Sequence, residues 1–534
     1  MRSAVFHCRA LCGAALLAAA ACTPGPDTLP NPDPVPDTFV LYERMSLLWD
    51  GAGNARFRGF DGALPPGTSL VVYDDDTQQQ LHEVTPEADG RFDVMLGGSL
   101  NQVYLVVPKR GTQTGISTRF RARKPVDVLR QSVQPRRAGT GSTPNQVVTA
   151  LDASTTGSTR AYVVLSGDNL VDNVDWDSGD RTGPVVALPE TASALGPVPA
   201  TPWAMVARGN RGFVSLYSQG RLAALDLDEG TVLGTTDAVS PVALPQATTV
   251  SPPADWDGDG QPEDTATAVL PRNPGGLAVM GDWAYVAFAN VLSTVSSGTA
   301  RYAPGMVVAF RLASDGRPTG ETRATFTRWP NPQHVVPHPD GAHVLVSCTG
   351  ELQRNGEVWT TGPSGVDVLD ADTLASTAGF ALPEFAPSRP LVLPDGHSVY
   401  VPSVLRARLA RLDLATGAVV AGPGGAADAV HVEDTDQLST VFECALHPTG
   451  LVFCGVFDTD SLVVVDPQGD AVRPFPFVAP INLSELSGNI RLGVQSLSIR
   501  PGRNGVDRTG ADILILLSLA SRVAAVDTRF ILGP

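Results

Sequence analysis

Lysine is almost absent from this 534-residue sequence, because only Lys109 and Lys124 occur and arginine supplies nearly all of the positive charge. The 38 Lys and Arg residues are outnumbered by 55 Asp and Glu residues, which gives a formal net charge of −17. A surface of that sign does not attract phosphate groups. The composition therefore argues against nucleic acid, and against an anionic membrane surface, as partners held by charge.

Long apolar runs are also missing beyond the N-terminus, so the only hydrophobic segment of note lies in residues 1–22. Arg2 and Arg9 give it a positive start, and the apolar run that follows is too short to span about 30 Å of hydrocarbon. This pattern is typical of an export signal. The small residues before Cys22 resemble a bacterial lipobox, which implies cleavage before Cys22 and lipidation of that residue; an ordinary secretory signal with an incidental cysteine is the alternative.

The segment after Cys22 reads TPGPDTLPNPDPVPD, and this proline-rich composition predicts an extended tether over residues 23–38. Together, the signal and the tether predict a lipid-anchored protein of a bacterial cell envelope. Thr23 gives no retention signal by the enteric rule, which favours the outer membrane.

Cysteine is scarce: after the signal and the lipidated position only Cys348, Cys444 and Cys454 remain. There is no C-x-x-C-H for covalent haem and no C-x-x-C pair for zinc. Cys444 and Cys454 flank a hairpin turn almost symmetrically, so a cross-strand disulfide is one interpretation in an exported protein. The other is that all three are small buried apolar residues.

Helical periodicity is missing as well, and short β-type runs separated by turn clusters take its place. In residues 39–125, SLVVYD and RFDVML alternate with a period of two, which indicates half-buried antiparallel strands. We expect a small β-sandwich here. The order of its runs is similar to that of bacterial immunoglobulin-like spacer modules.

Residues 126–534 contain a degenerate repeat, which is recognised by two recurring sequence patterns. One is a hairpin such as RPLVLPDGHSVYVPS, in which Asp-Gly suits a tight turn. The other is an apolar strand that ends in aspartate. The aspartates are Asp226, Asp370, Asp413, Asp466 and Asp527. Aligning both patterns gives seven repeat units of about four strands each. The units begin near Gln146, Pro202, Gly275, Pro332, Ser388, Val441 and Gln495.

Seven units of four antiparallel strands predict an all-β fold, a seven-bladed β-propeller, preceded by the small sandwich. The hairpin LVLPDGHSVYVPS and the run LARLDLATGAVVAG resemble repeats of the YVTN-type, lactonase-like propellers. Units one and three depart from the pattern, since NLVDNVD replaces the usual strand in one and Arg311 replaces the aspartate in the other. We expect residues 126–134 to help close the ring beside the last unit.

The clearest ligand motif is DWDGDGQPED, in a predicted insertion at about residues 250–268. Its carboxylates repel one another without a hard cation, and their spacing is similar to that of DxDxDGxxD calcium loops. The residue at position twelve is Ala266 and not glutamate, which disfavours a true EF-hand. We expect structural calcium, against the alternative of a solvated acidic loop. The ligands would be Asp255, Asp257, Asp259, Gln261 and Glu263.

The histidines do not predict a metal centre on the propeller axis, although some propellers hold copper there. They are His334, His338, His343, His397 and His447. They cluster in units four to six, and three of them lie in or beside hairpin turns, where a polar residue is an ordinary turn residue.

No G-x-S-x-G nucleophile turn and no cofactor motif occurs. The resemblance implies sugar-lactone hydrolysis as one activity, but its histidine, arginine and glutamate cannot be placed on this sequence, and fold alone does not transfer activity. We therefore expect a non-catalytic surface scaffold that binds an unknown protein or carbohydrate. The insertions at 236–273 and 289–304 would be its recognition loops. A lactonase-like hydrolase is the alternative.

Overall fold

The computed structural model describes most of the chain between residues 45 and 526. Single residues are left out at 89, 100, 101, 116 and 182. The described ranges are 45–49, 53–59, 63–122, 136–139, 143–149, 160–176, 181–244, 268–294, 300–355, 358–432, 439–467, 471–472, 481–482, 492–500 and 513–526.

These residues form an all-β fold, as the sequence predicts: they contain β-strands and one 3-10 turn, Ser518–Ala520, with no α-helix in the described ranges. Within the same ranges, the structure contains no helix with the length and apolar character that crossing a bilayer requires.

The N-terminal module consists of two antiparallel sheets around a shared core. One sheet has the order β1-β2-β5, and the other has the order β4-β3-β6-β7 with β8 paired to β6. Leu70 and Val72 of one sheet are buried in the same cluster as Phe57 of the other, so the predicted alternation is confirmed. The strands are β1 (Met45–Trp49), β2 (Asn54–Gly59), β3 (Ser69–Asp74), β4 (Gln80–Val84), β5 (Phe92–Gly97), β6 (Val103–Arg110), β7 (Gln113–Thr114) and β8 (Thr118–Arg121).

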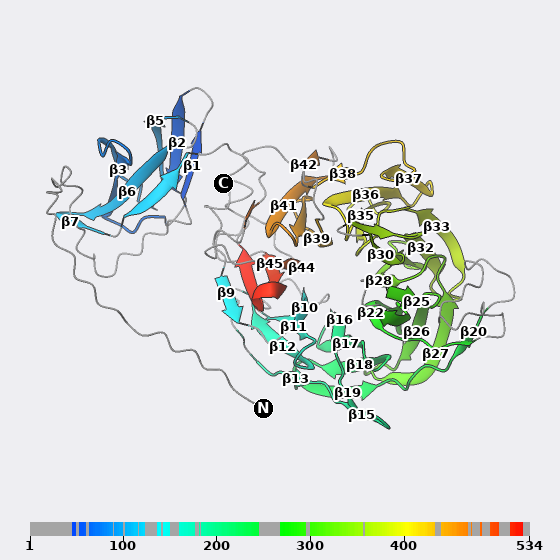
Figure 1. Ribbon diagram of the computed structural model, residues 1–534. Coiled ribbons are helices and arrows are strands. Elements are labelled where there is room, and N and C mark those ends of the chain that lie inside the picture. Colours follow the sequence, from blue (N-terminus) through cyan, green and yellow to red (C-terminus); the bar gives the residue numbers. More distant parts are fainter. Residues whose placement is uncertain are drawn as a thin grey trace, which may run out of the picture.

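The rest of the described chain is a β-propeller (Figure 1), built from seven sheets in which four strands follow one another from the inner to the outer edge. The first three are β10 (Pro144–Thr149), β11 (Arg160–Leu165), β12 (Leu170–Asp175) and β13 (Val186–Ala187); β16 (Pro202–Arg208), β17 (Arg211–Leu216), β18 (Arg221–Asp226) and β19 (Thr231–Thr235); and β22 (Pro274–Met280), β23 (Trp283–Phe288), β26 (Met306–Leu312) and β27 (Pro318–Phe326).

The next three sheets continue around the ring, and two of them carry an extra short strand, β38 or β43. They are β28 (Pro332–Pro337), β29 (His343–Cys348), β32 (Gly365–Asp370) and β33 (Ser376–Ala381); β34 (Leu391–Val392), β35 (Ser398–Pro402), β36 (Arg408–Asp413), β37 (Ala418–Ala421) and β38 (Val430–His431); and β39 (Val441–Leu446), β40 (Val452–Val456), β41 (Ser461–Asp466), β42 (Ala471–Val472) and β43 (Ile481–Asn482).

The last sheet joins the two ends of the propeller. It contains β44 (Val494–Ile499), β45 (Ile513–Leu517) and β46 (Arg522–Val526), and its outer strand is β9 (Arg136–Gly139) from before the first sheet. The sequence predicted closure by residues 126–134, which lie outside the described residues. The strand that closes the ring is β9, directly after that segment.

Buried clusters between neighbouring sheets hold the ring together. Val163 of β11, for example, shares a cluster with Leu514 of β45 and Val523 of β46, which joins the first sheet to the last. Comparable clusters lie between each other pair of adjacent sheets. Because burial of apolar side chains is the main source of stability, each sheet depends on both neighbours.

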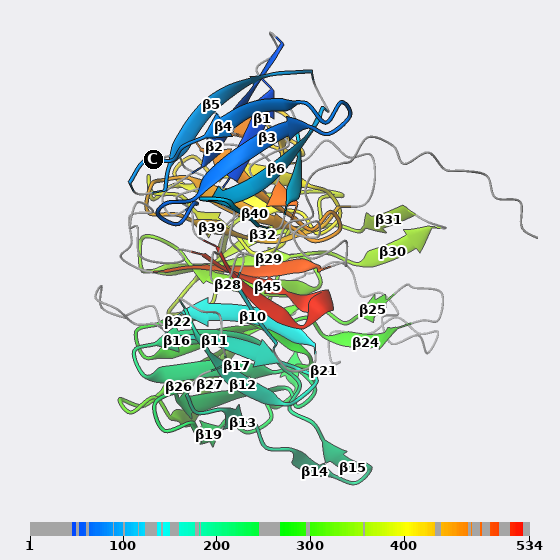
Figure 2. The same cartoon turned by 90° about the vertical axis from the view of Figure 1, so that its left-hand side faces the viewer.

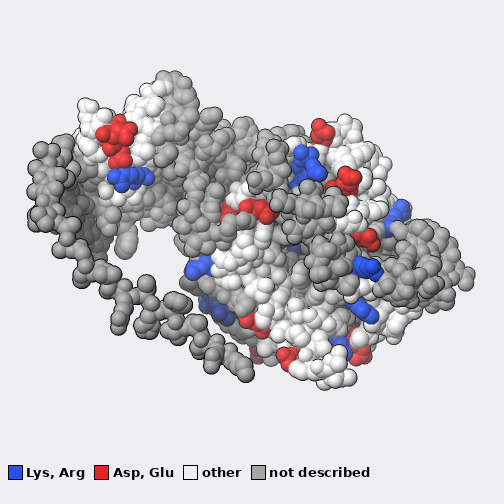
Figure 3. Space-filling model, viewed as in Figure 1, with Lys and Arg blue, Asp and Glu red and all other residues white. Residues whose placement is uncertain are grey.

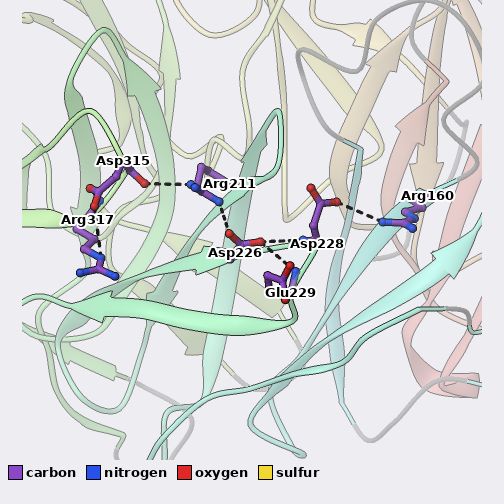
Figure 4. A network of polar contacts seen from close by, with 7 residues as sticks. All are labelled: Arg160, Arg211, Asp226, Asp228, Glu229, Asp315 and Arg317. Atoms are coloured by element: carbon purple, nitrogen blue, oxygen red, sulfur yellow. Dashed lines mark hydrogen bonds and ion pairs between the residues drawn. The ribbon is translucent and has the colours of Figure 1, made fainter.

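The repeated aspartates have a structural cause that Figure 4 shows at the end of β18. Asp226 Oδ1 accepts hydrogen bonds from the backbone N–H groups of Asp228 and Glu229, at 3.1 and 3.0 Å, and its other oxygen pairs with Arg211. Asp370 and Asp413 cap the corresponding turns in the same way. A short side chain that accepts from the N–H groups two and three residues further along the chain fixes the turn to the outer strand.

In the part of the chain that the structure describes, four two-stranded sheets are inserted among the propeller sheets, and three of them lie between β18 and β32. Figure 2 shows the hairpins β24–β25 and β30–β31 projecting on one side of the molecule. The inserted strands are β14 (Thr191–Ser193), β15 (Gly196–Val198), β20 (Val242–Ala243), β21 (Ala268–Val269), β24 (Val291–Thr294), β25 (Ala300–Tyr302), β30 (Leu352–Asn355) and β31 (Val358–Thr361).

Candidate functional site

The innermost strands of the propeller share an irregularity that directs side chains toward the centre. In six of the seven sheets the register between the first and second strands shifts near the start of the first, as between Pro332 and His334 of β28. A bulge of this kind re-aims the side chains beside it. In five of these six sheets the side chains at these positions line one cavity of about 520 Å³, while the third sheet has Gly275 and Gly276 there.

Three side chains with acid–base or charged groups come together on the wall of this cavity. They are His334 of β28, Arg389 just before β34, and Glu443 of β39, from three successive sheets. Arg389 Nη1 forms an ion pair with Glu443 Oε1. A cation, a carboxylate and an imidazole in one concave site are the usual components of a catalytic or polar binding centre.

Glu443 is held in place by the next sheet as well as by Arg389. Its Oε2 accepts hydrogen bonds from Ser496 Oγ at 2.5 Å and from the backbone N–H of Leu497 at 3.4 Å. Its side chain is only 11% exposed, so the carboxylate has little water around it. A carboxylate fixed in this way also fixes the guanidinium that it pairs with.

His334 is neutral at physiological pH. Burial, with a smaller contribution from the positive charge of Arg389, lowers the pKa of its imidazole to about 3. The imidazole ring of His334 has room because the facing strand, β22, has a glycine at this point. A Cβ added to Gly276 would lie 2.9 Å from His334 Nδ1. A neutral imidazole can accept a proton from a bound molecule, which imidazolium cannot.

Aromatic side chains also line the cavity. Trp203 and Tyr217 stack with their ring centroids 5.1 Å apart, and Tyr302 and Phe442 also line the space. Burial raises the pKa of Tyr302 to about 12, so its hydroxyl keeps its proton and can donate a hydrogen bond. The cavity thus offers aromatic surface as well as polar groups.

One of the two insertions that the sequence predicts as recognition loops forms part of the cavity wall. The segment 289–304 forms β24 and β25 and places Val291 and Tyr302 in the cavity wall, and the next hairpin adds Leu352 of β30. The segment 236–273 contains β20 and β21, while its residues 245–267 lie outside the described part of the chain.

No protein-family model matches the sequence, and no curated protein matches it. Among solved structures, the fold is similar to hydrazine synthase of Kuenenia stuttgartiensis, at 14% identity over 72% of this chain and 95% of the other, with a TM-score of 0.46. It is also similar to a streptogramin B lyase, at 9% identity over 74% and 97%, with a TM-score of 0.45. A third is virginiamycin B lyase from Staphylococcus aureus, at 6% identity over 74% and 99%, with a TM-score of 0.44.

The expectation of a non-catalytic protein is corrected by these findings. It rested on the apparent lack of a histidine, an arginine and a carboxylate that could meet in the channel, yet His334, Arg389 and Glu443 line one cavity. Each of the three similar structures is named for an enzyme. The sequence did not place His334, Arg389 and Glu443 together because they lie in different repeat units and only the ring brings them together.

Most of the other predicted site residues lie outside the described part of the chain. This holds for Cys22 and for the predicted calcium ligands Asp255, Asp257, Asp259, Gln261 and Glu263, so lipidation and structural calcium stay predictions of the sequence.

The cysteines are described. Cys444 of β39 and Cys454 of β40 are directly opposite in the register, with Cα atoms 4.2 Å apart, and a disulfide joins them. Cys348 is buried with a free thiol, and burial raises its pKa. The disulfide follows Glu443 directly in the chain, so it ties the strand that carries the cavity carboxylate to its neighbour.

Sequence reasoning named His334 only among the histidines that do not predict a metal centre, and it missed Arg389 and Glu443, although a signal for all three exists. His334 and Glu443 both lie two residues after the start of their units, at Pro332 and Val441, and Arg389 lies one residue after Ser388. A comparison of the residues one and two positions after the start of each repeat unit would have selected the polar residues that line the cavity. The histidines near the hairpin turns, His338, His397 and His447, lie there as expected.

Charged side chains are dispersed over the described part of the face that Figure 3 draws. On the face drawn in Figure 3, the acidic and basic side chains that are coloured alternate over the ring without forming one extended patch. Among the described residues, several of these charges pair with each other, as Arg311 does with Asp282 and Glu321. The central cavity is therefore the strongest candidate for a functional site.

Proposed function

We propose that the protein is a hydrolase that opens a small cyclic ester in the central cavity of the propeller. The observation that carries this proposal is the convergence of a neutral His334 with the Arg389–Glu443 pair in one cavity. The resemblance of the repeats to lactonase-like propellers supports the same class of reaction. The export signal, with its lipobox-like end at Cys22, adds a location at the cell envelope to the proposal.

In this reaction Arg389 binds the carbonyl oxygen of the ester. A guanidinium has five N–H donors, so pairing with Glu443 leaves donors for that oxygen and for the negative charge that develops on it. Glu443 keeps Arg389 in position through its own contacts with Ser496 and Leu497. The aromatic wall, with Trp203 stacked on Tyr217, binds the ring of the substrate.

His334 then acts as the base. It removes a proton from a water molecule as the water oxygen bonds to the carbonyl carbon. The negative charge that forms on the substrate beside the imidazole of His334 favours the protonated imidazolium. This offsets the low basicity that burial imposes on His334. When the ring C–O bond breaks, the leaving oxygen takes the proton from His334, and the product is an open hydroxy acid.

The test is hydrolysis of a panel of alkyl, aryl and sugar lactones by the purified protein, followed by pH-stat titration. His334→Gln should lower kcat by at least about 100-fold, the usual contribution of a general base. Arg389→Lys and Glu443→Gln should lower kcat/KM, because both disturb the oxyanion contact. His397→Gln, in a turn outside the cavity, is the matched control and should retain full activity.

Binding is measured separately with a lactam of the best substrate, which cannot be hydrolysed in the same way. His334→Gln should bind the lactam with nearly unchanged affinity, since the base acts after binding. The proposal is wrong if the wild-type protein opens none of the lactones, or if His334→Gln opens them as fast as the wild type does.

A further inference from the structure

A second cluster of potential ligands lies at the hairpin between β28 and β29, away from the cavity residues. His338 follows β28, Asp340 lies in the turn, and His343 begins β29. One ligand atom from each of the three side chains lies within 4.8 Å of the others. His338 Nδ1 is 2.9 Å from Asp340 Oδ1, and His343 Nδ1 is 2.6 Å from Asp340 Oδ2.

The two contacts of His338 Nδ1 compete with each other. Its Nδ1 lies 3.1 Å from the backbone N–H of Asp340, which donates to it, and 2.9 Å from the carboxylate oxygen of the same residue. An imidazole nitrogen carries either a lone pair or a proton, so it cannot accept from the N–H and donate to the carboxylate at once. When Nδ1 carries its lone pair, that lone pair faces the carboxylate oxygen, and a cation bound by both atoms removes the repulsion between them.

The carboxylate is well suited to bind such a cation. Asp340 Oδ1 accepts from the N–H groups of Ala342 and His343, at 2.8 and 3.1 Å, which fixes the carboxylate within the turn.

We propose that His338, Asp340 and His343 form a zinc site. Two imidazole nitrogens and one carboxylate oxygen suit Zn²⁺, whereas Ca²⁺ and Mg²⁺ require oxygen ligands throughout. The side chains are 17%, 40% and 28% exposed, so solvent reaches the cluster and a water molecule completes a four-coordinate centre. The metal joins the end of β28 to the start of β29 and stabilises the hairpin.

Two sister hairpins of the same propeller provide an internal comparison. The next sheet has Asp395 and His397, with the closest ring nitrogen 3.7 Å from the carboxylate, and no second histidine in its turn. The sheet after that has His447 and Thr449, and no carboxylate in the turn sequence HPTG. Only the β28–β29 hairpin combines all three ligands among these turns, so the zinc site is not a general property of the repeat.

The experiment measures zinc uptake by the untagged full-length protein after its metals have been removed. Zn²⁺ alone is titrated against a chromophoric chelator, with excess Ca²⁺ present to occupy oxygen-only sites such as the predicted loop at 255–263. The variants are His338→Gln, His343→Gln and Asp340→Asn, and the control is His397→Gln. Asp340→Asn retains an oxygen that can accept the turn hydrogen bonds from Ala342 and His343, so this variant removes the ligand charge and keeps the turn.

We expect one tight zinc ion in the wild type and in His397→Gln. Loss of an outer partner of a metal ligand already weakens binding 10–100-fold, so loss of a ligand should weaken it by more than about 100-fold. Zinc should also raise the melting temperature of the wild type and of His397→Gln, and not that of the three variants. The assignment is overturned if the wild type binds no zinc, or if the three variants bind it as the wild type does.

Discussion

His334 combines two properties that seldom coincide in one side chain. It lines a cavity that is open to a ligand, and burial lowers the pKa of its imidazole to about 3. The cost of charging this ring within the folded protein is what keeps it neutral and able to accept a proton. The same cost links the residue to the stability of the whole chain.

That link predicts how stability changes with pH. In the unfolded chain His334 has its ordinary pKa of 6.5, whereas in the folded chain its pKa is about 3. Above pH 6.5 both states are neutral, and between the two values only the unfolded state takes up the proton, so stability falls as the pH is lowered through this window. From pH 7 to pH 5 the imidazole should account for about 2 kcal/mol of lost stability, which His334→Gln removes.

Urea unfolding at the two pH values measures this difference. Gln333→Ala is the control, because it truncates a neighbouring cavity side chain that does not titrate. His447, whose pKa burial lowers to about 4, contributes to the pH dependence of all of these proteins equally. Parallel stability curves for the wild type and His334→Gln would show that the imidazole is not desolvated.

At the scale of the element, the turn after the third strand of a sheet depends on one aspartate. Asp226 accepts two backbone hydrogen bonds in the turn to β19 and pairs with Arg211 of β17. The hydrogen bond from Glu229, opposed by burial and assisted by Arg211, lowers the pKa of its carboxyl. Replacement therefore tests whether the turn contacts or the ion pair matter more.

We expect Asp226→Ala to lower the free energy of unfolding by about 1–2 kcal/mol, because it leaves two turn N–H groups without their acceptor. Asp226→Asn keeps an acceptor oxygen and loses only the charge, so it should cost less than about 1 kcal/mol. Chemical denaturation of the two variants gives both values. If asparagine proved as harmful as alanine, the ion pair with Arg211 would be the main contribution.

The repeating elements were predictable because their signals are local. The unit starts predicted at Pro332 and Val441 coincide with the first residues of β28 and β39, since alternation and turn residues depend on near neighbours only. The cavity was not predictable in this way. Arg389 and Glu443 are 54 residues apart in the chain, and their pairing depends on how two sheets sit in the ring. The repeat pattern contains no information about that distance.

At the scale of the whole molecule, polar contacts around the axis connect successive sheets. Glu443 accepts from Ser496 of the last sheet, Ser496 accepts from the N–H of Val147 in the first, and Gln146 accepts from the N–H of Met205 in the second. These contacts cross the junction at which the chain begins and ends the ring. The cavity is therefore intact only if the ring is closed.

Closure depends on β9, which supplies the outer strand of the last sheet. A chain that begins at residue 126 keeps β9, whereas one that begins at residue 140 lacks it and leaves the edge of β46 unpaired. We expect the shorter chain to melt at a lower temperature and to self-associate, because an open edge strand pairs with other chains. Scanning calorimetry and light scattering on the two proteins test this. Equal melting temperatures would mean that the apolar cluster between the first and last sheets, with Val163 and Leu514, closes the ring without β9.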